Sequence, residues 1–246
     1  MKHLGWQILL GVFLILLSAI GYVIHYLIFR DAHHIFLYLV GDVAFVFIQV
    51  LLVTLIIDRV LNVREKRTRM KKLNMVIGAF FSEVGTMLLT YLSDFDSKLD
   101  KLRKELIVTS DWSEREFSDV SKRLKNYDYS VEIHKIDLEH LRSFLVGKRA
   151  FLLRLLENPN LLEHESFTEL LWAVFHLTEE LAHRKDVGQL SDTDMEHLAG
   201  DIKRVYVLLV HQWLDYMKHL KNNYPYLFSL AMRTNPFDQN ASVEVK

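Results

Sequence analysis

Two long apolar stretches, separated by five residues, constrain the fold of this chain more than any other feature of its sequence. The first, residues 4–29, contains no Asp, Glu, Lys or Arg, and the second, residues 35–57, is interrupted only by Asp42 and Gln49. A helix needs about 20 apolar residues to cross the hydrocarbon core of a bilayer. Both stretches meet that length, so the sequence predicts two membrane-spanning helices.

The connection between the two stretches, residues 30–34, is too short for anything except a tight turn, so we expect an antiparallel hairpin. The first stretch also exceeds the apolar core of about 7–15 residues in a cleaved signal peptide, which favours a retained helix. Positive charge marks the cytoplasmic side of membrane helices. The segment after the second stretch is basic, so we expect both termini in the cytoplasm and the turn outside.

The basic segment, residues 59–72, has two compatible interpretations. It sets the topology of the hairpin, or it also contacts anionic lipid headgroups, where each basic side chain contributes about 1 kcal/mol. The expected lipid-contact residues are Arg59, Arg64, Lys66, Arg67, Arg69, Lys71 and Lys72.

Beyond the basic segment the sequence predicts helices only, and the expected fold class is all-α. Apolar residues recur at helical spacing through residues 73–92, and no proline separates this segment from the second apolar stretch, so one helix is expected to continue into the cytosol. Further helices are expected at 113–124, 132–147, 148–157, 166–185, 191–222 and 225–233. The expected organisation is a hairpin at 1–58, the basic segment, a cytoplasmic helical domain at 73–236 and a flexible tail at 237–246.

Local signals place the starts of several helices. "SERE" and "SFTE", which begin at Ser113 and Ser166, have the spacing of a capping box. Ser191 or Asp192 is expected to cap the long helix that follows, and Ser93 or Asp94 to cap a helix in "SDFDSKLDKLRKEL". Within residues 73–92, Gly78 and Gly85 lie seven apart on one face, where a neighbouring helix could approach closely.

Several classes of chemistry find no support in the sequence. The chain has no cysteine, which excludes disulfides, thiolate nucleophiles and Cys-ligated metals. It also lacks a Gly-rich phosphate loop, a nucleophile elbow and an H-E-x-x-H motif. The net charge is -1, and no basic stripe runs between the aromatic residues, so nucleic-acid binding is not expected. We therefore expect neither an enzyme nor a resident cofactor.

The chain has 12 histidines, and several recur beside acids at helical spacing. Placed at about 100° per residue, they lie opposite the apolar face of each helix. The residues are Glu169, His176, Glu180 and His183 on one helix, and His197, Asp201, Arg204, His211, Asp215 and His219 on the next. A solvated polar face is the favoured interpretation, ahead of an oligomer or partner surface. A metal site ranks last, because its ligands must project into the bundle.

Asp42 is the ionisable residue that the hairpin has to accommodate. At about 1.5 Å per residue it lies about 10 Å below the outer end of its helix, level with His25 on the antiparallel partner. Gln49 shares its face. Asp42 is then hydrated near the interface, part of a helix-packing contact between subunits with Gly41, or an ion- or proton-sensing site with His25 and Gln49. All three interpretations remain open at the level of the sequence.

Four segments together resemble a group of uncharacterised bacterial membrane proteins with an amino-terminal hairpin and a helical cytoplasmic domain. The segments are "GDVAFVFIQVLLVTLIIDRVL", "KKLNMVIGAFFSEVG", "LLENPNLLEHESFTELLWAVFHLTEEL" and "YPYLFSLAMRTNPF". The resemblance implies a protein of the bacterial cytoplasmic membrane. It implies no activity, substrate or catalytic residue.

The leading hypothesis is a non-enzymatic, membrane-anchored helical module that forms homo-oligomers and acts as a scaffold, sensor or partner-binding module at the cytoplasmic face. Its expected partners are membrane lipids, further copies of the chain and a cytoplasmic protein. A second hypothesis is a subunit of an oligomeric ion channel or transporter, with Asp42 and Gln49 lining the pathway. A third is a metal-dependent helical-bundle enzyme that uses the His and acid residues.

Overall fold

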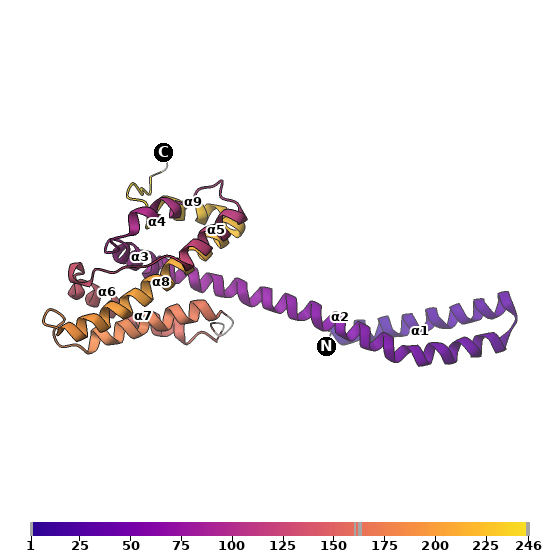
Figure 1. The fold of residues 1–246 in the computed structure, drawn as a ribbon. Coiled ribbons are helices and arrows are strands. Elements are labelled where there is room, and N and C mark those ends of the chain that lie inside the picture. The colour runs from indigo at the N-terminus through magenta and orange to yellow at the C-terminus, as the bar shows by residue number, and fades with distance from the viewer. Residues whose placement is uncertain (1, 160, 162–163, 245–246) are drawn as a thin grey trace. The chain divides into compact units, whose positions relative to one another are not determined.

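The computed structural model describes residues 2–159, 161 and 164–244, apart from the side chains at 2–5, 7, 67–69, 71 and 100–102. Every regular element in these ranges is helical, which confirms the all-α fold class (Figure 1). The elements are α1 (Lys2–Phe29), α2 (Ala32–Phe80), η1 (Phe81–Gly85), α3 (Thr86–Ser93), α4 (Leu99–Leu106), α5 (Glu114–Lys125), η2 (Ile133–Lys135), α6 (Leu138–Leu156), α7 (Glu165–His183), α8 (Asp192–Asn223) and α9 (Pro225–Arg233).

The chain divides into two compact units, Met1–Glu65 and Lys66–Lys246, which we call the hairpin and the C-terminal unit. In the hairpin, α1 and the first part of α2 run antiparallel around a tight turn (Figure 1). Arg30 adopts a positive φ of 49° in the turn, and the Asp31 carboxylate accepts the backbone N–H groups of His33 and His34. The turn therefore supplies its own cap for α2.

α2 is one continuous helix of 49 residues, as the missing proline predicts. It ends in η1, a five-residue π-helical turn, and the chain continues directly as α3. Among the described residues, three helical stretches are long and apolar enough to cross a membrane: Ile8–Phe29, Ala32–Lys66 and Lys72–Ser93. Neighbouring helices bury 44% of the third stretch and none of the first two. The third stretch thus belongs to the core of the C-terminal unit.

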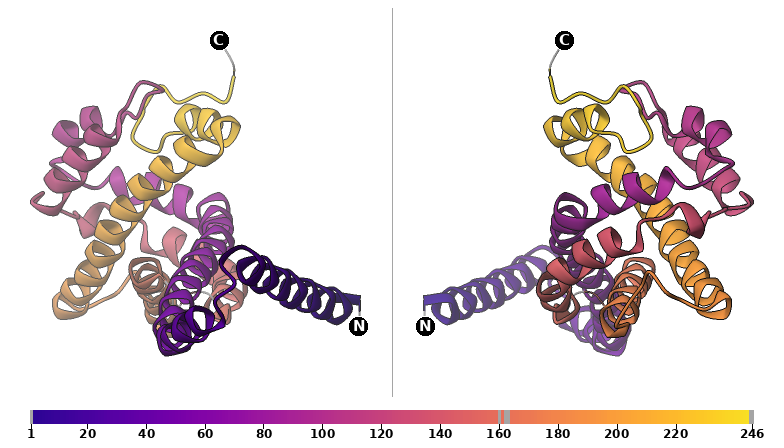
Figure 2. Two further views of the ribbon diagram at one scale, coloured as in Figure 1. Left: turned by 90° about the vertical axis from the view of Figure 1, so that its right-hand side faces the viewer. Right: turned by 90° about the vertical axis from the view of Figure 1, so that its left-hand side faces the viewer.

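α8 is the central helix of the C-terminal unit, and it crosses the unit along its length (Figure 2). α7 packs along one part of α8, α5 and α9 pack near its C-terminal end, and α6 packs against α7. The apolar faces predicted for α7 and α8 are buried, with Phe167, Leu177, Leu181, Ile202 and Leu209 inaccessible to solvent. A helix with neighbours on several sides must bury more than one apolar stripe.

Two of the expected helix starts are confirmed. Ser113 forms a complete capping box with Glu116, and the Ser191 hydroxyl accepts the backbone N–H of Asp194 at the start of α8. Ser166, in contrast, does not cap α7. The N-cap is His164, whose Nδ1 accepts the Phe167 N–H at 3.2 Å, while the Ser166 hydroxyl donates to Gln212 of α8. α7 begins one residue before Ser166, so this hydroxyl lies inside the first turn and bonds to the neighbouring helix.

The structure corrects two further helix boundaries. Residues 138–156 form the single helix α6 in place of two helices meeting at residue 148, because Gly147 lies on an open face that a helix tolerates. α4 begins at Leu99, so neither Ser93 nor Asp94 caps it. Asp96 has instead turned inward, where its carboxylate accepts the Lys98 N–H at 3.0 Å.

The C-terminal segment begins with a residue of the core. Phe237, which the sequence places in the flexible tail, is 1% exposed, and its ring meets Trp213 edge-on with 5.0 Å between centroids. Asn235, which is also buried, donates to the Leu106 carbonyl at 2.8 Å and accepts the Phe237 N–H at 2.9 Å. Packing therefore extends beyond residue 236.

Candidate functional site

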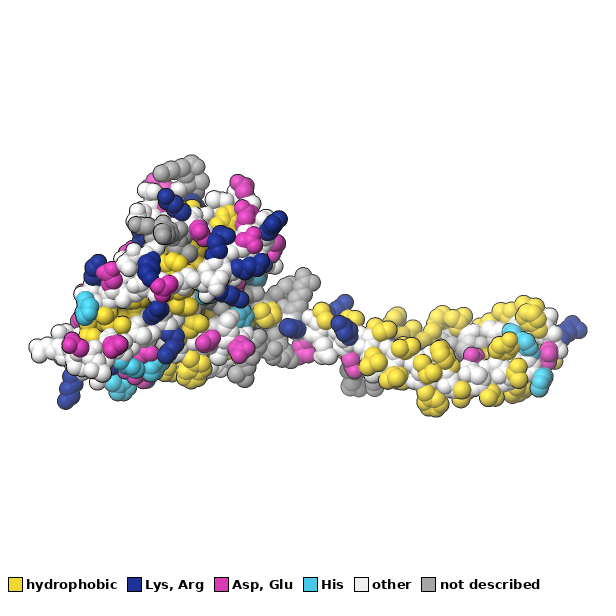
Figure 3. Space-filling view, in the orientation of Figure 1, with side chains coloured by type: hydrophobic (Ala, Val, Ile, Leu, Met, Phe, Trp, Pro, Cys, Tyr) yellow, Lys and Arg dark blue, Asp and Glu magenta, His cyan; other side chains and the backbone are white. Residues whose placement is uncertain are grey.

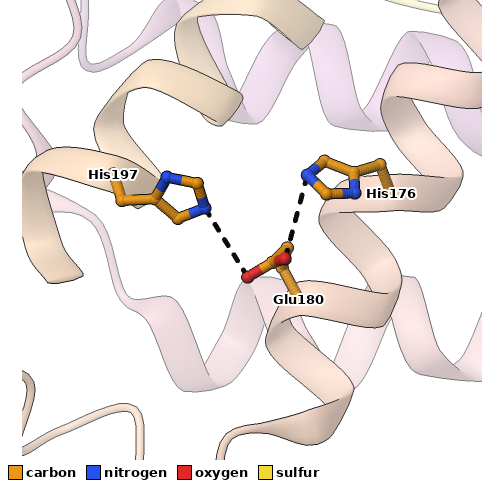
Figure 4. Close-up of side chains that lie close together, drawn as sticks. All are labelled: His176, Glu180 and His197. Atoms are coloured by element: carbon orange, nitrogen blue, oxygen red, sulfur yellow. Dashed lines mark ion pairs between the residues drawn. The ribbon is translucent and has the colours of Figure 1, made fainter.

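Four side chains of the predicted polar faces converge between α7 and α8, and we call them the His/acid cluster. His176 and Glu180 are one turn apart on α7, and His197 and Asp201 are one turn apart on α8. Figure 4 shows the two imidazoles on either side of the Glu180 carboxylate. Because α7 packs along α8, each helix contributes one imidazole and one carboxylate to the same place.

Both imidazoles turn the same ring atom toward the acids. Nε2 of His176 lies 3.4 Å from Oδ2 of Asp201 and 3.8 Å from Oε1 of Glu180. Nε2 of His197 lies 3.4 Å from the same Asp201 oxygen and 3.7 Å from Oε2 of Glu180. These separations are longer than the 2.7–3.2 Å usual for N–H···O hydrogen bonds. The four groups therefore face one another without direct hydrogen bonds.

Asp201 is the buried member of the cluster. Its side chain is only 5% exposed, whereas the side chains of His176 and His197 are about half exposed. Oδ1 accepts a hydrogen bond from the Arg204 guanidinium at 3.1 Å, but Oδ2 has no hydrogen-bond partner in the described part of the chain. A buried carboxylate oxygen without a partner is costly and calls for an explanation.

Arg184 holds the opposite side of the cluster. Its guanidinium donates to Glu180 Oε2 at 2.6 Å and to both carboxylate oxygens of Asp194. The hydrogen bond from Arg184 lowers the pKa of Glu180, and the same guanidinium lowers the pKa of Asp194. Both acids are therefore held in the ionised form.

The position of Asp201 corrects the interpretation that both polar faces point away from the core. Placement around α8 alone puts Asp201 opposite the apolar stripe, but α7 covers that side of α8. Of the remaining residues of the predicted faces, Arg204 contacts the cluster through Asp201, and Asp215 is exposed farther along α8. Glu169 and His183 are exposed, and His211 and His219 are half-buried farther along α8 with pKa values that burial lowers.

The predicted intramembrane residues lie in the hairpin, and no hydrogen bond or ion pair joins them to one another among the described residues. The His25 ring stacks on His34 at 6.1 Å and packs against Phe29, and no hydrogen bond or ion pair joins it to Asp42 among the described residues. Asp42 and Gln49 are exposed on the same helix. The sensing role of His25, Asp42 and Gln49 stays a prediction.

The basic segment lies entirely within α2. Arg59, Arg64, Lys66 and Lys72 are exposed, while the side chains of Arg67, Arg69 and Lys71 lie outside those that the structure describes. Contact of this segment with lipid headgroups stays a prediction.

An apolar groove of about 720 Å³ lies in the C-terminal unit between the end of α2, α8 and α9, and it was not predicted from the sequence. Met75, Tyr226 and Leu230 are exposed along it. Gly78, which the sequence singles out, lines this groove. An added Cβ on Gly78 would lie 3.2 Å from the Tyr216 hydroxyl. The atoms that approach Gly78 are those of the Tyr216 ring and hydroxyl, so a side chain of α8 fills this place and the expected close approach of a helix stays a prediction.

A buried carboxyl group lies beside three tyrosines elsewhere in the C-terminal unit. Asp96 is 6% exposed, and its Oδ2 accepts the Tyr127 hydroxyl at 3.1 Å. The rings of Tyr127, Tyr129 and Tyr206 follow one another edge to face. Burial is the main cause that raises the pKa of Asp96 above its ordinary value.

We expect Asp96→Asn to make the protein more stable at neutral pH. A carboxyl whose pKa is raised by folding contributes stability below its unfolded pKa, about 3.9, and loses that contribution as pH rises through the folded pKa. Asparagine does not ionise, and it keeps an acceptor for the Lys98 N–H. Thermal unfolding at several pH values should therefore show a higher Tm for the variant at pH 7 and a shrinking difference toward pH 4.

Asp128→Asn is the matched control, because the ion pair with Lys98 lowers the pKa of Asp128 at the surface. Its effect should be small and opposite in sign. An Asp96→Asn variant that is less stable than the parent at pH 7 would contradict the buried-carboxyl argument.

The fold and these sites define a class of all-α protein in which an apolar helical hairpin precedes a helical unit. Two family models match the chain: "MJ1433, N-terminal helical domain" over residues 2–61 and "Uncharacterized protein MJ1433, C-terminal helical domain" over residues 69–233. The chain is 48% identical over 243 residues to "Uncharacterized protein MJ1433" of Methanocaldococcus jannaschii, covering 99% of this chain and 98% of that protein. The chain belongs to the MJ1433 family.

No solved structure matches the chain. The family match confirms the resemblance to an uncharacterised group of helical proteins, and the family descriptions name helical domains only. The relative comes from an archaeon, so the bacterial source implied by the resemblance stays a prediction.

Proposed function

We propose that this protein is a membrane-anchored helical module whose C-terminal unit works at the cytoplasmic face as a scaffold, sensor or partner-binding domain. The observation that carries the proposal is the exposure of the hairpin. Its two apolar stretches have mean hydropathies of 2.4 and 2.5, and the protein itself buries none of either stretch. A surface this apolar needs a covering phase, and a bilayer supplies one.

The surface chemistry of the two units differs in the way that an anchored protein requires. Figure 3 shows apolar side chains over the visible face of the hairpin, whereas acidic and basic side chains mix over the C-terminal unit. The exposed basic residues at the start of the cytoplasmic part, Arg59, Lys66 and Lys72 among them, support a topology with both termini inside. They also support contact with anionic headgroups.

Homo-oligomerisation is part of the proposal. An added Cβ on Gly41 would meet no atom within 4 Å, so this side of α2 leaves room for another helix to approach closely. The carboxylate of the adjacent Asp42 has no hydrogen bond or ion pair among the described residues of the hairpin, which supports a partner from another chain. The lack of a catalytic motif in the sequence supports a non-enzymatic role.

The topology can be tested directly because the chain has no cysteine. We expect a His33→Cys variant to react with a membrane-impermeant maleimide in intact cells, because the turn faces outward. A Lys122→Cys variant, whose side chain is 73% exposed in the C-terminal unit, should react only after the cells are opened. Both variants should stay in the membrane fraction after alkaline extraction.

The cysteine-free parent is the control for background labelling. Labelling of Lys122→Cys in intact cells would reverse the topology. Release of the protein by alkaline extraction would overturn membrane anchoring itself.

A further inference from the structure

We propose that the His/acid cluster binds one divalent transition-metal ion, with Zn²⁺ the best fit, and that the ion ties α7 to α8. The ligands are Nε2 of His176, Nε2 of His197, one carboxylate oxygen of Glu180 and Oδ2 of Asp201. Two imidazoles with two carboxylates form a donor set that suits this class of metal.

The distances from the two imidazole nitrogens to the acid oxygens are close to those of a tetrahedral site. Bonds of about 2.0–2.2 Å to Zn²⁺ place neighbouring ligand atoms about 3.3–3.6 Å apart at the edges of a tetrahedron. Asp201 Oδ2 lies 3.4 Å from both imidazole nitrogens. Glu180 faces them with different oxygens, Oε1 at 3.8 Å from His176 and Oε2 at 3.7 Å from His197. The donor atoms of His176, Glu180 and His197 all lie within 4.8 Å of one another. Small rotations of the Glu180 carboxylate and of the two half-exposed imidazoles would bring one Glu180 oxygen to the ion and complete the geometry.

The buried oxygen of Asp201 is independent support for a ligand at this place. It is aimed at the centre of the cluster and has no hydrogen-bond partner among the described residues, although its side chain is only 5% exposed. A cation between the imidazoles would satisfy it. An apolar or hydrogen-bonded neighbour would have been expected if the position served packing alone.

The surrounding arginines orient the acids toward such an ion. Arg204 holds Asp201 through Oδ1 and leaves Oδ2 directed at the imidazoles. Arg184 holds Glu180 through Oε2, the oxygen that faces His197, while Oε1 faces His176. Outer partners of this kind fix carboxylate ligands in metal sites. The two guanidinium groups also partly neutralise the negative charges of Glu180 and Asp201.

The consequence for the protein is a link across the connection between α7 and α8. With four protein ligands the ion keeps no open position, so its role is to stabilise rather than to catalyse. Each helix contributes two ligands at i and i+4, so the ion bridges helices that are joined in the chain only through residues 184–191. Its binding would raise the stability of the folded state by mass action.

The test uses the full chain, purified in detergent and stripped of metal with a chelator. It is titrated with Co²⁺ alone, whose visible absorption reports tetrahedral coordination, and then with Zn²⁺ as a competitor. We expect one Co²⁺ per chain, displacement by Zn²⁺, and a higher Tm with either ion. The His176→Ala and His197→Ala variants should bind more weakly by more than the roughly 10–100-fold that loss of an outer partner costs.

His183→Ala is the matched control, because His183 lies on α7 outside the cluster and is exposed. It should bind Co²⁺ like the parent. Asp201→Asn keeps the size of the buried side chain and an acceptor for Arg204, and it should lose binding while a cooperative thermal transition shows that the fold is retained. A parent protein that binds no Co²⁺, or a His176→Ala variant that binds it as tightly as the parent, overturns the proposal.

Discussion

Replacing Phe237 with alanine is expected to lower the free energy of unfolding of the C-terminal unit by about 3–5 kcal/mol, the usual cost of removing a buried aromatic ring. Phe237 is 1% exposed and packs edge-on against Trp213 of the central helix α8. Asn235 fixes the approach of the segment through its bonds to Leu106 and to the Phe237 N–H. Because the segment is fixed in this way, we expect that it cannot move in to fill the cavity that alanine leaves.

Denaturant unfolding of the full chain in detergent, followed by circular dichroism, measures this loss. Tyr226→Ala is the control, because Tyr226 is an aromatic residue of the same region that is 71% exposed. It should change stability by no more than about 0.5 kcal/mol. If Phe237→Ala were as mild as this control, residues from 237 onward would be a dispensable tail, as the sequence suggests.

Gly85→Ala is expected to destabilise the protein by about 1–3 kcal/mol, the range typical of an overpacked core. An added Cβ would lie 2.7 Å from Phe81 and 2.8 Å from Phe80, both buried. Neither ring can move away. Phe80 is held edge-on against Phe167, and Phe81 is stacked on Tyr216 at 5.1 Å. The π-helical turn at Phe81–Gly85 brings these rings against the glycine.

The same substitution at Gly147 provides a control of opposite sign. Gly147 lies inside α6, and an added Cβ there would meet no atom within 4 Å, so alanine should stabilise the helix by about 0.5–1 kcal/mol. Unfolding curves of the two variants should shift in opposite directions. If Gly85→Ala and Gly147→Ala stabilised the protein equally, the rings of Phe80 and Phe81 would have to move aside without cost, which would contradict the prediction for Gly85.

The sequence by itself determined the features that depend on neighbours along the chain. The hairpin turn, the continuous α2, the capping box at Ser113 and the helix at 225–233 all follow from apolar spacing, short connections and side chains within four residues. Four members of the candidate metal site were also found as pairs: His176 with Glu180, and His197 with Asp201. Their i, i+4 spacing is local, so it is visible without a fold.

Only the tertiary structure decided which faces meet. Placement around α8 alone gives Asp201 a position opposite the apolar stripe, yet α7 covers that position and buries the carboxylate against two imidazoles. Phe237 is likewise buried by packing against α8, and His164, not Ser166, is the N-cap of α7. The period of a helix reports where its residues lie around its own axis. The free energy of packing between helices distant in sequence decides what each side contacts.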